Sequence, residues 1–164
     1  IGEYPLSIFE MTLTSITEIP YSFCNTTSTL NTDFHYITIQ LNDELRELPV
    51  CLGDLSIGNL WIVGQNYITG TLPSSIFCSN TTQLMVILNN TFDQQTIPSC
   101  LSNMTSLTIL ALSNSSFSGK FPVLPKRMLQ YINLGHSNFE GSISEIFAPM
   151  LNEPRLFNDK YEVL

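Results

Sequence analysis

The sequence predicts a solenoid of stacked repeats, in which each repeat contributes one short strand to a parallel sheet. Pairs of an apolar residue and a proline recur at intervals of 22 to 29 residues, and copies of an apolar triplet precede them at similar intervals. A fixed period of this length is typical of repeat architectures. The chain has 164 residues, of which 43% are hydrophobic, so it can bury a core and is not intrinsically disordered.

The apolar-proline pairs set the period. They are Ile19-Pro20, Leu48-Pro49, Leu72-Pro73, Ile97-Pro98 and Phe121-Pro122, and Ile143-Ser144 continues the series without proline. Proline has no N–H to donate, so each pair suits an extended segment at a position where no donor is needed.

The triplets have a spacing of three and then two residues. They are Leu6, Phe9 and Met11; Phe34, Ile37 and Ile39; Gly58, Trp61 and Val63; Thr82, Met85 and Ile87; Leu107, Leu110 and Leu112; and Leu129, Ile132 and Leu134. Side chains of a strand alternate between its faces, so each triplet predicts a strand that points apolar groups into the solenoid. We expect strands near 9–11, 37–39, 61–63, 85–87, 110–112 and 132–134, in one parallel sheet.

A small polar residue follows each triplet after three positions. These residues are Thr14, Asn42, Asn66, Asn90, Ser115 and Ser137. An Asn side chain at such a point can bond backbone groups of the neighbouring repeat, whereas Ser and Thr offer fewer donors. We therefore expect a polar ladder beside the sheet that is looser in the first, fifth and sixth repeats.

The combined pattern resembles the plant-type leucine-rich repeat, L-x-x-L-x-L-x-x-N-x-F-x-G-x-I-P. Residues 106–122 and 66–73 follow it closely, and the resemblance covers about residues 5–147 in six repeats. It implies an α/β-type superhelix with a short parallel strand per repeat on the concave face and irregular or 3₁₀ segments on the convex side. We expect this leucine-rich repeat solenoid over 1–147, and a non-repeat tail over 148–164 that caps it or connects it to another chain.

Four cysteines lie on the convex side of this frame, shortly after the prolines. Neighbouring repeats bring Cys24 near Cys51 and Cys78 near Cys100, so we favour those two disulfides in an oxidising compartment. Joining Cys51 to Cys78 would leave the other two cysteines three repeats apart, beyond disulfide reach. Four buried free thiols are the alternative.

Five N-x-[ST] sequons predict N-linked glycans on a secreted protein. They begin at Asn25, Asn80, Asn89, Asn103 and Asn114. In the repeat frame three of them fall on the convex arc, while Asn89 and Asn114 fall beside the last strand position and would flank the concave face.

The concave face is the expected contact surface for a protein partner. Its first register is Ile8, Tyr36, Leu60, Leu84, Ile109 and Tyr131, and its second is Glu10, Thr38, Ile62, Val86, Ala111 and Asn133. An exposed apolar patch of this kind marks a binding surface. The partner-binding residues we expect are Tyr36, Leu60, Ile62, Leu84, Val86, Ile109 and Tyr131.

Several function classes are excluded or disfavoured. A net charge of −8 disfavours nucleic acid and anionic membranes, and no apolar run is long enough for a membrane helix. No nucleophile-elbow, zinc-protease, P-loop or dinucleotide motif is present, so we expect no enzyme and no cofactor or metal. His35 and His136 lie four repeats apart, too far to share a metal.

The resemblance implies a secreted binding module, as in plant receptor ectodomains and inhibitors of cell-wall-degrading enzymes. The main alternative is a structural protein whose copies assemble head to tail, because no terminal cap is visible and the tail carries apolar residues. An ice-binding solenoid is a third possibility, but it needs a regular Thr or Asn array, which the irregular repeats lack.

Overall fold

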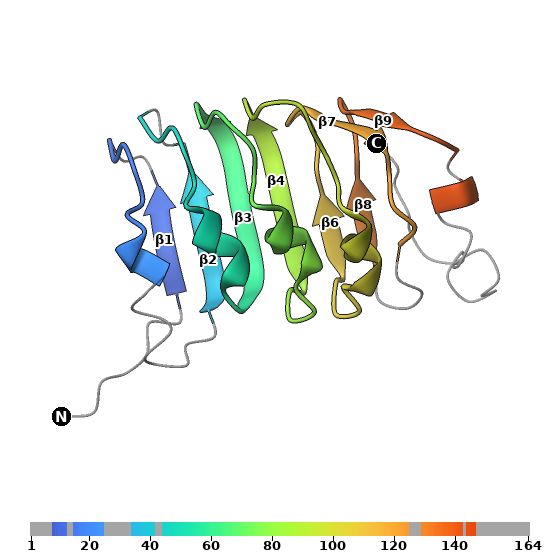
Figure 1. Cartoon of the computed structure of the whole chain (residues 1–164), viewed down its shortest axis with the longest axis horizontal. Helices are drawn as coiled ribbons and strands as arrows, with labels where there is room; N and C mark the ends of the chain where they lie inside the picture. Colours follow the sequence, from blue (N-terminus) through green and yellow to red (C-terminus); the bar gives the residue numbers. More distant parts are fainter. Residues whose placement is uncertain are drawn as a thin grey trace.

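The main element of the fold is a six-stranded parallel sheet whose strands follow one another in chain order (Figure 1). The computed structural model describes residues 8–12, 15–24, 34–41, 44–124, 129–142 and 144–146. The strands are β1 (Ile8–Thr12), β2 (Phe34–Gln40), β3 (Ile57–Asn66), β4 (Leu84–Asn90), β6 (Ile109–Ala111) and β8 (Tyr131–Asn133). The parallel strands expected from the triplets are confirmed at all six places.

A second, smaller parallel sheet and a row of 3₁₀ helices complete the repeats. The sheet contains β5 (Gln95–Thr96), β7 (Phe117–Lys120) and β9 (Asn138–Glu140). The helices are η1 (Val50–Asp54), η2 (Ser74–Cys78) and η3 (Ser99–Asn103), which lie side by side in Figure 1. Each begins directly after a proline, whose fixed φ suits the first turn of a helix and whose missing N–H has no helical partner to bond there.

The core lies between the large sheet and these segments. One register row joins Ile37, Leu60, Met85, Leu110 and Ile132, all of them buried. Branched and unbranched aliphatic chains stacked at strand spacing fill this layer without polar atoms. Each repeat therefore packs its apolar row against the rows of its neighbours.

The expected polar ladder is present where the structure describes it. Asn90 Nδ2 donates to the carbonyl oxygens of Ile62 at 2.8 Å and Leu88 at 2.9 Å. Ser115 Oγ lies 3.4 Å from the Ile87 oxygen of the preceding repeat and 3.1 Å from the Ser113 oxygen, and Ser137 Oγ donates to the Leu112 oxygen at 2.8 Å. A serine hydroxyl has one proton to donate, whereas Asn90 uses its amide group twice, which makes the serine rungs weaker. Thr14, Asn42 and the side chain of Asn66 lie outside the described residues.

The sequence interpretation of the third repeat was wrong by one residue. Leu60 and Ile62 are 1% and 0% exposed and belong to the core, while Asn59 and Trp61 take the outward positions. The register shifts between Val63 and Asn66, where Gly64 has a φ of +80°. This bulge adds one residue before Asn66, so counting back from that asparagine exchanged the two faces of the strand.

The tail over 148–164 and the sequon residue Asn25 lie outside the described residues. The proposed boundary at residue 147 therefore stays a prediction.

Candidate functional site

The candidate site is the face of the six-stranded sheet that points away from the core, here called the open face. Every strand contributes at least two outward positions, and the register aligns these in two rows across all six strands. The longer strands β1 to β4 add a third, shorter row of Thr12, Gln40, Val63 and Leu88, which is not counted below. The first row is Ile8, Tyr36, Asn59, Leu84, Ile109 and Tyr131, and the second is Glu10, Thr38, Trp61, Val86, Ala111 and Asn133. These twelve residues define the open face.

The first row leaves large apolar side chains accessible to solvent. Ile8 is 57% exposed, Tyr36 48% and Tyr131 38%, while Leu84 and Ile109 between them are half-buried. Strand spacing of about 4.8 Å brings Ile8 next to Tyr36 on one side of Asn59. On the other side it brings Leu84, Ile109 and Tyr131 next to one another. The row is therefore an apolar and aromatic strip that one polar residue, Asn59, interrupts at β3.

Four of the seven expected contact residues lie accessible on this strip: Tyr36, Leu84, Ile109 and Tyr131. Leu60 and Ile62 are excluded because they are in the core. Val86 has an outward register position but is only 5% exposed, since it is a short side chain in a row beside Trp61. Its contribution to a contact surface is correspondingly small.

The sequence reasoning missed Trp61, which is half-buried and outward, and Asn59 beside it. A usable signal was present, because Ile57, Leu60 and Ile62 match the triplet spacing better than Gly58, Trp61 and Val63 do. Asn59 Nδ2 donates to the His35 carbonyl oxygen at 2.9 Å, which fixes that side chain against the second strand. Tryptophan and tyrosine are favoured at protein interfaces because they bury a large area at a small cost in entropy.

The open face carries little charge. Glu10 is the only Asp, Glu, Lys or Arg residue among its twelve positions. The remaining members are apolar, aromatic, hydroxyl or amide side chains. Such a surface suits the burial of apolar partner groups, with polar contacts at its margins.

One margin of the open face carries two of the expected sequons. Asn89 is the second-last residue of β4 and Asn114 comes after β6. Their φ angles are 56° and 49°, a conformation that Asn tolerates, and both residues are exposed. Asn114 Nδ2 donates to Asn89 Oδ1 at 3.0 Å. Asn80 and Asn103 are exposed near the ends of η2 and η3. Glycans on all four residues remain a prediction.

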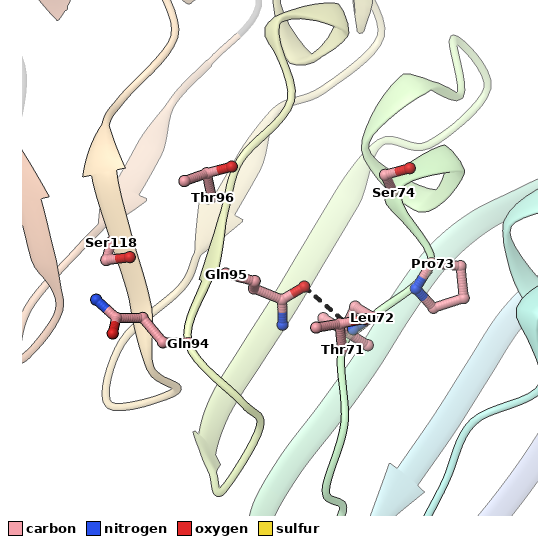
Figure 2. A pocket seen from close by; sticks show the side chains of 8 residues that line it. All are labelled: Thr71, Leu72, Pro73, Ser74, Gln94, Gln95, Thr96 and Ser118. Carbon is pink, nitrogen blue, oxygen red and sulfur yellow. Dashed lines mark hydrogen bonds between the residues drawn. The ribbon is translucent and has the colours of Figure 1, made fainter.

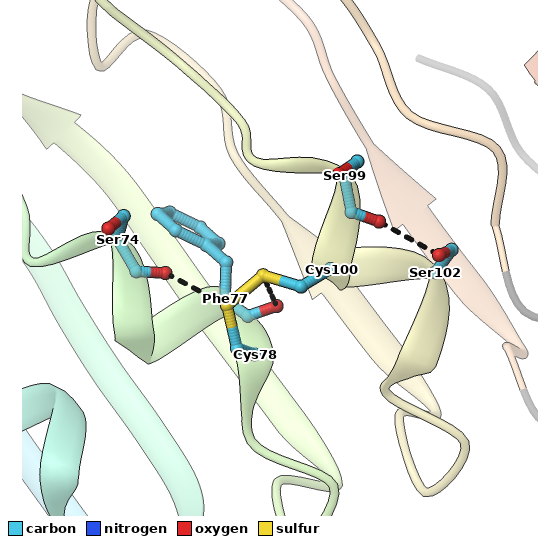
Figure 3. The surroundings of a disulfide bond; sticks show 6 residues. All are labelled: Ser74, Phe77, Cys78, Ser99, Cys100 and Ser102. Carbon is cyan, nitrogen blue, oxygen red and sulfur yellow. Dashed lines mark hydrogen bonds between the residues drawn. A yellow bond between two sulfur atoms is a disulfide. The ribbon is translucent and has the colours of Figure 1, made fainter.

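Two disulfides tie the repeats together on the side of the 3₁₀ helices. Cys24 bonds Cys51 with a Cα separation of 6.1 Å, and Cys78 bonds Cys100 with 5.0 Å. Figure 3 shows the second bond between η2 and η3. These are the two pairs that the repeat frame favours, and both span neighbouring repeats.

The described residues include neither a metal-binding cluster nor a membrane-spanning helix. Within those ranges no group of three or more His, Cys, Asp or Glu residues lies close enough to hold a metal ion. His35 and His136 are both exposed, on β2 and after β8, with three strands between them. The described segments also include no helix with the length and apolarity needed to cross a membrane.

A comparison with known proteins finds a plant relative. Over 71 residues the chain is 37% identical to receptor-like protein 54 of Arabidopsis thaliana, a stretch that covers 43% of the chain and 9% of that protein. The chain thus spans a small part of the length of this relative. The similarity agrees with the resemblance to plant-type repeats. No protein-family model matches the sequence, and no solved structure matches it.

Proposed function

We propose that this chain is an extracellular recognition module of leucine-rich repeats that binds a protein partner through the open face. In this proposal the repeats form a solenoid and the open face is its concave surface. The observation that carries the proposal is the exposed strip from Ile8 through Tyr36 to Tyr131, built on six neighbouring strands. Exposed apolar side chains on a sheet are unfavourable in water, and a partner that covers them removes this cost.

Three further observations support an extracellular setting. The two disulfides require an oxidising compartment to persist. Four sequon asparagines, Asn80, Asn89, Asn103 and Asn114, are exposed and so are open to carry glycans. The relative in Arabidopsis thaliana is a receptor-like protein.

We propose binding rather than catalysis. The open face has a single carboxylate, Glu10, and neither His35 nor His136 is among its twelve residues. The open face therefore does not offer the two titratable groups that general acid–base catalysis would need.

The alternative of head-to-tail assembly has less support. It depends on the tail over 148–164, which lies outside the described residues, and similarity to a receptor-like protein does not favour it. An ice-binding surface has even less support, because tyrosine, tryptophan and aliphatic residues interrupt the Thr and Asn positions of the open face.

The test compares two triple variants of the secreted chain in crosslinking capture from plant extracellular fluid. The first carries Tyr36→Ser, Trp61→Ser and Tyr131→Ser on the open face. The control carries Tyr21→Ser, Val50→Ser and Val123→Ser, which are exposed residues outside the open face. We expect the native chain and the control to capture the same protein and the open-face variant to lose it.

Capture that survives the open-face substitutions and fails in the control would place the contact elsewhere and contradict the proposal. Circular dichroism of both variants establishes that each is folded.

A further inference from the structure

A second surface, separate from the open face, has the features of a ligand site. A groove of about 650 Å³ opens between neighbouring repeats beside β5 (Figure 2). Its polar lining consists of Thr71, Ser74, Gln94, Gln95, Thr96 and Ser118. None of these residues is among the twelve that define the open face.

The groove arises from an insertion in the fourth repeat. Phe92 and Pro98 are six positions apart, whereas Ile68 and Pro73, like Phe117 and Pro122, are five apart. The third and fourth repeats begin to pair here, because the Asp93 N–H donates to the Gly70 carbonyl oxygen at 2.8 Å. This pairing does not continue as a ladder, because β5 is the edge of the second sheet and the segment 71–73 is not a strand.

Gln95 spans the resulting opening with its side chain. Its Oε1 accepts a hydrogen bond from the Leu72 backbone N–H at 3.1 Å, in place of a backbone partner (Figure 2). That bond fixes which end of the amide is oxygen. The other end, Nε2, is buried and finds no acceptor among the described residues. A buried donor without a partner costs free energy, so a small movement that turns Nε2 toward an acceptor oxygen of a ligand in the groove would be favoured.

The lining also determines the chemistry of that ligand. All eight residues around the groove are uncharged, and Leu72 and Pro73 add apolar surface to the hydroxyl and amide groups. A charged ligand would lose its hydration there without meeting an opposite charge. The net charge of −8 further disfavours anions. Hydroxyl and amide groups both donate and accept, which complements a ligand that carries many hydroxyls.

We propose that this groove binds a neutral oligosaccharide, and that Gln95 Nε2, which is covered in the unbound structure, becomes accessible on binding and donates to one of its oxygens. Sugar hydroxyls match the Thr, Ser and Gln groups, and the C–H faces of the rings match Leu72 and Pro73. The groove has a volume within the usual range of small-ligand sites. This inference does not depend on protein binding at the open face.

The experiment is calorimetric titration of the full chain with cellotetraose, mannotetraose and chitotetraose, and with trigalacturonate as the anionic comparison. We expect at least one neutral saccharide to bind with a Kd below about 1 mM. Gln95→Glu retains an acceptor for the Leu72 N–H and removes the donor, so it should weaken that binding by about tenfold or more. Gln83→Glu makes the same change at an exposed residue outside the groove and should leave the affinity unchanged.

Thr96→Val is the second variant, because it removes a hydroxyl from the groove and retains the β-branched shape that suits a strand. Thr96→Val should also weaken saccharide binding. If Gln95→Glu does not fold, the affinity of Thr96→Val tests whether the groove is the binding site. The proposal is overturned if no neutral saccharide binds, or if trigalacturonate binds more tightly than all of them. It is also overturned if binding survives both groove variants, or is lost in Trp61→Ser on the open face.

Discussion

At the scale of single residues, polar side chains inside the core decide how the repeats hold together. Asn90 is 4% exposed and joins two carbonyl groups, one of them on the preceding strand. The Ile62 carbonyl lies in β3 and the Leu88 carbonyl lies in β4, so the amide links these two strands from the core side. One amide therefore satisfies backbone groups of two neighbouring repeats.

Asn90→Ala should lower the free energy of unfolding by about 3 kcal/mol, since it leaves the Ile62 and Leu88 carbonyls without this donor. Urea unfolding followed by circular dichroism measures the loss. Asn138→Ala, at an exposed position on β9, is the control and should change stability by about 0.5 kcal/mol or less. Equal losses in the two variants would mean that the two buried hydrogen bonds do not contribute to the free energy of unfolding. The substitution keeps the Asn89 sequon intact, so glycosylation does not confound the comparison.

Residue-level chemistry also sets how much of the structure the sequence predicts. The triplet of Leu107, Leu110 and Leu112 predicts its buried face correctly, because alternation along a strand is a strict geometric rule. The bulge at Gly64 was not predicted, because a glycine in a strand is compatible both with a regular strand and with an inserted residue.

The site was predicted in part for the same reason. Tyr36 and Tyr131 follow directly from regular repeats, but Trp61 required the correct register of an irregular one. The groove at Gln95 was not predicted at all, since it depends on how an insertion is accommodated between two repeats.

At the scale of elements, the 3₁₀ helices pack against one another with almost no free space. A Cβ added to Gly53 in η1 would overlap the Ser75 side chain and lie 2.9 Å from the backbone nitrogen of Ile76 in η2. Backbone atoms cannot move aside as the end of a side chain can. Glycine at this position therefore sets the distance between η1 and η2.

Gly53→Ala should destabilise the chain by about 2 kcal/mol, because the two helices must move apart to admit a methyl group. Thermal unfolding of the purified chain measures the effect. Asp54→Ala changes the exposed neighbour at the end of the same helix and serves as the control. If both variants unfold at the same temperature as the native chain, the contact between η1 and η2 is looser than described.

At the scale of the whole molecule, the disulfides join repeats in pairs. Cys24 and Cys51 are 27 residues apart in the sequence, and Cys78 and Cys100 are 22 residues apart. No disulfide links the repeat that contains β2 to the repeat that contains β3. The two closed loops restrict the unfolded chain and so stabilise the folded one. The boundaries between β2 and β3, between β4 and β6, and between β6 and β8 therefore depend on packing and hydrogen bonds alone.

Replacing both Cys78 and Cys100 by serine should cost roughly 3 kcal/mol in the chain-entropy model. Chemical denaturation of the double variant against the native chain measures this loss. Non-reducing peptide mapping of the native chain should recover Cys24 linked to Cys51 and Cys78 linked to Cys100. A peptide joining Cys51 to Cys78, or four thiols that react with an alkylating agent before reduction, would contradict the pairing.

The paired disulfides also determine how the chain would respond to mechanical tension. If its two ends were pulled apart, the residues enclosed by each bond could not extend, which withholds about 90 Å and about 75 Å of contour length. Reduction would release both lengths. The first separation under load would be expected between β4 and β6 or between β6 and β8, where no disulfide links the repeats and the register joins three residue pairs, against six between β2 and β3. A change in redox conditions would then alter how far this segment stretches, as well as how stably it folds.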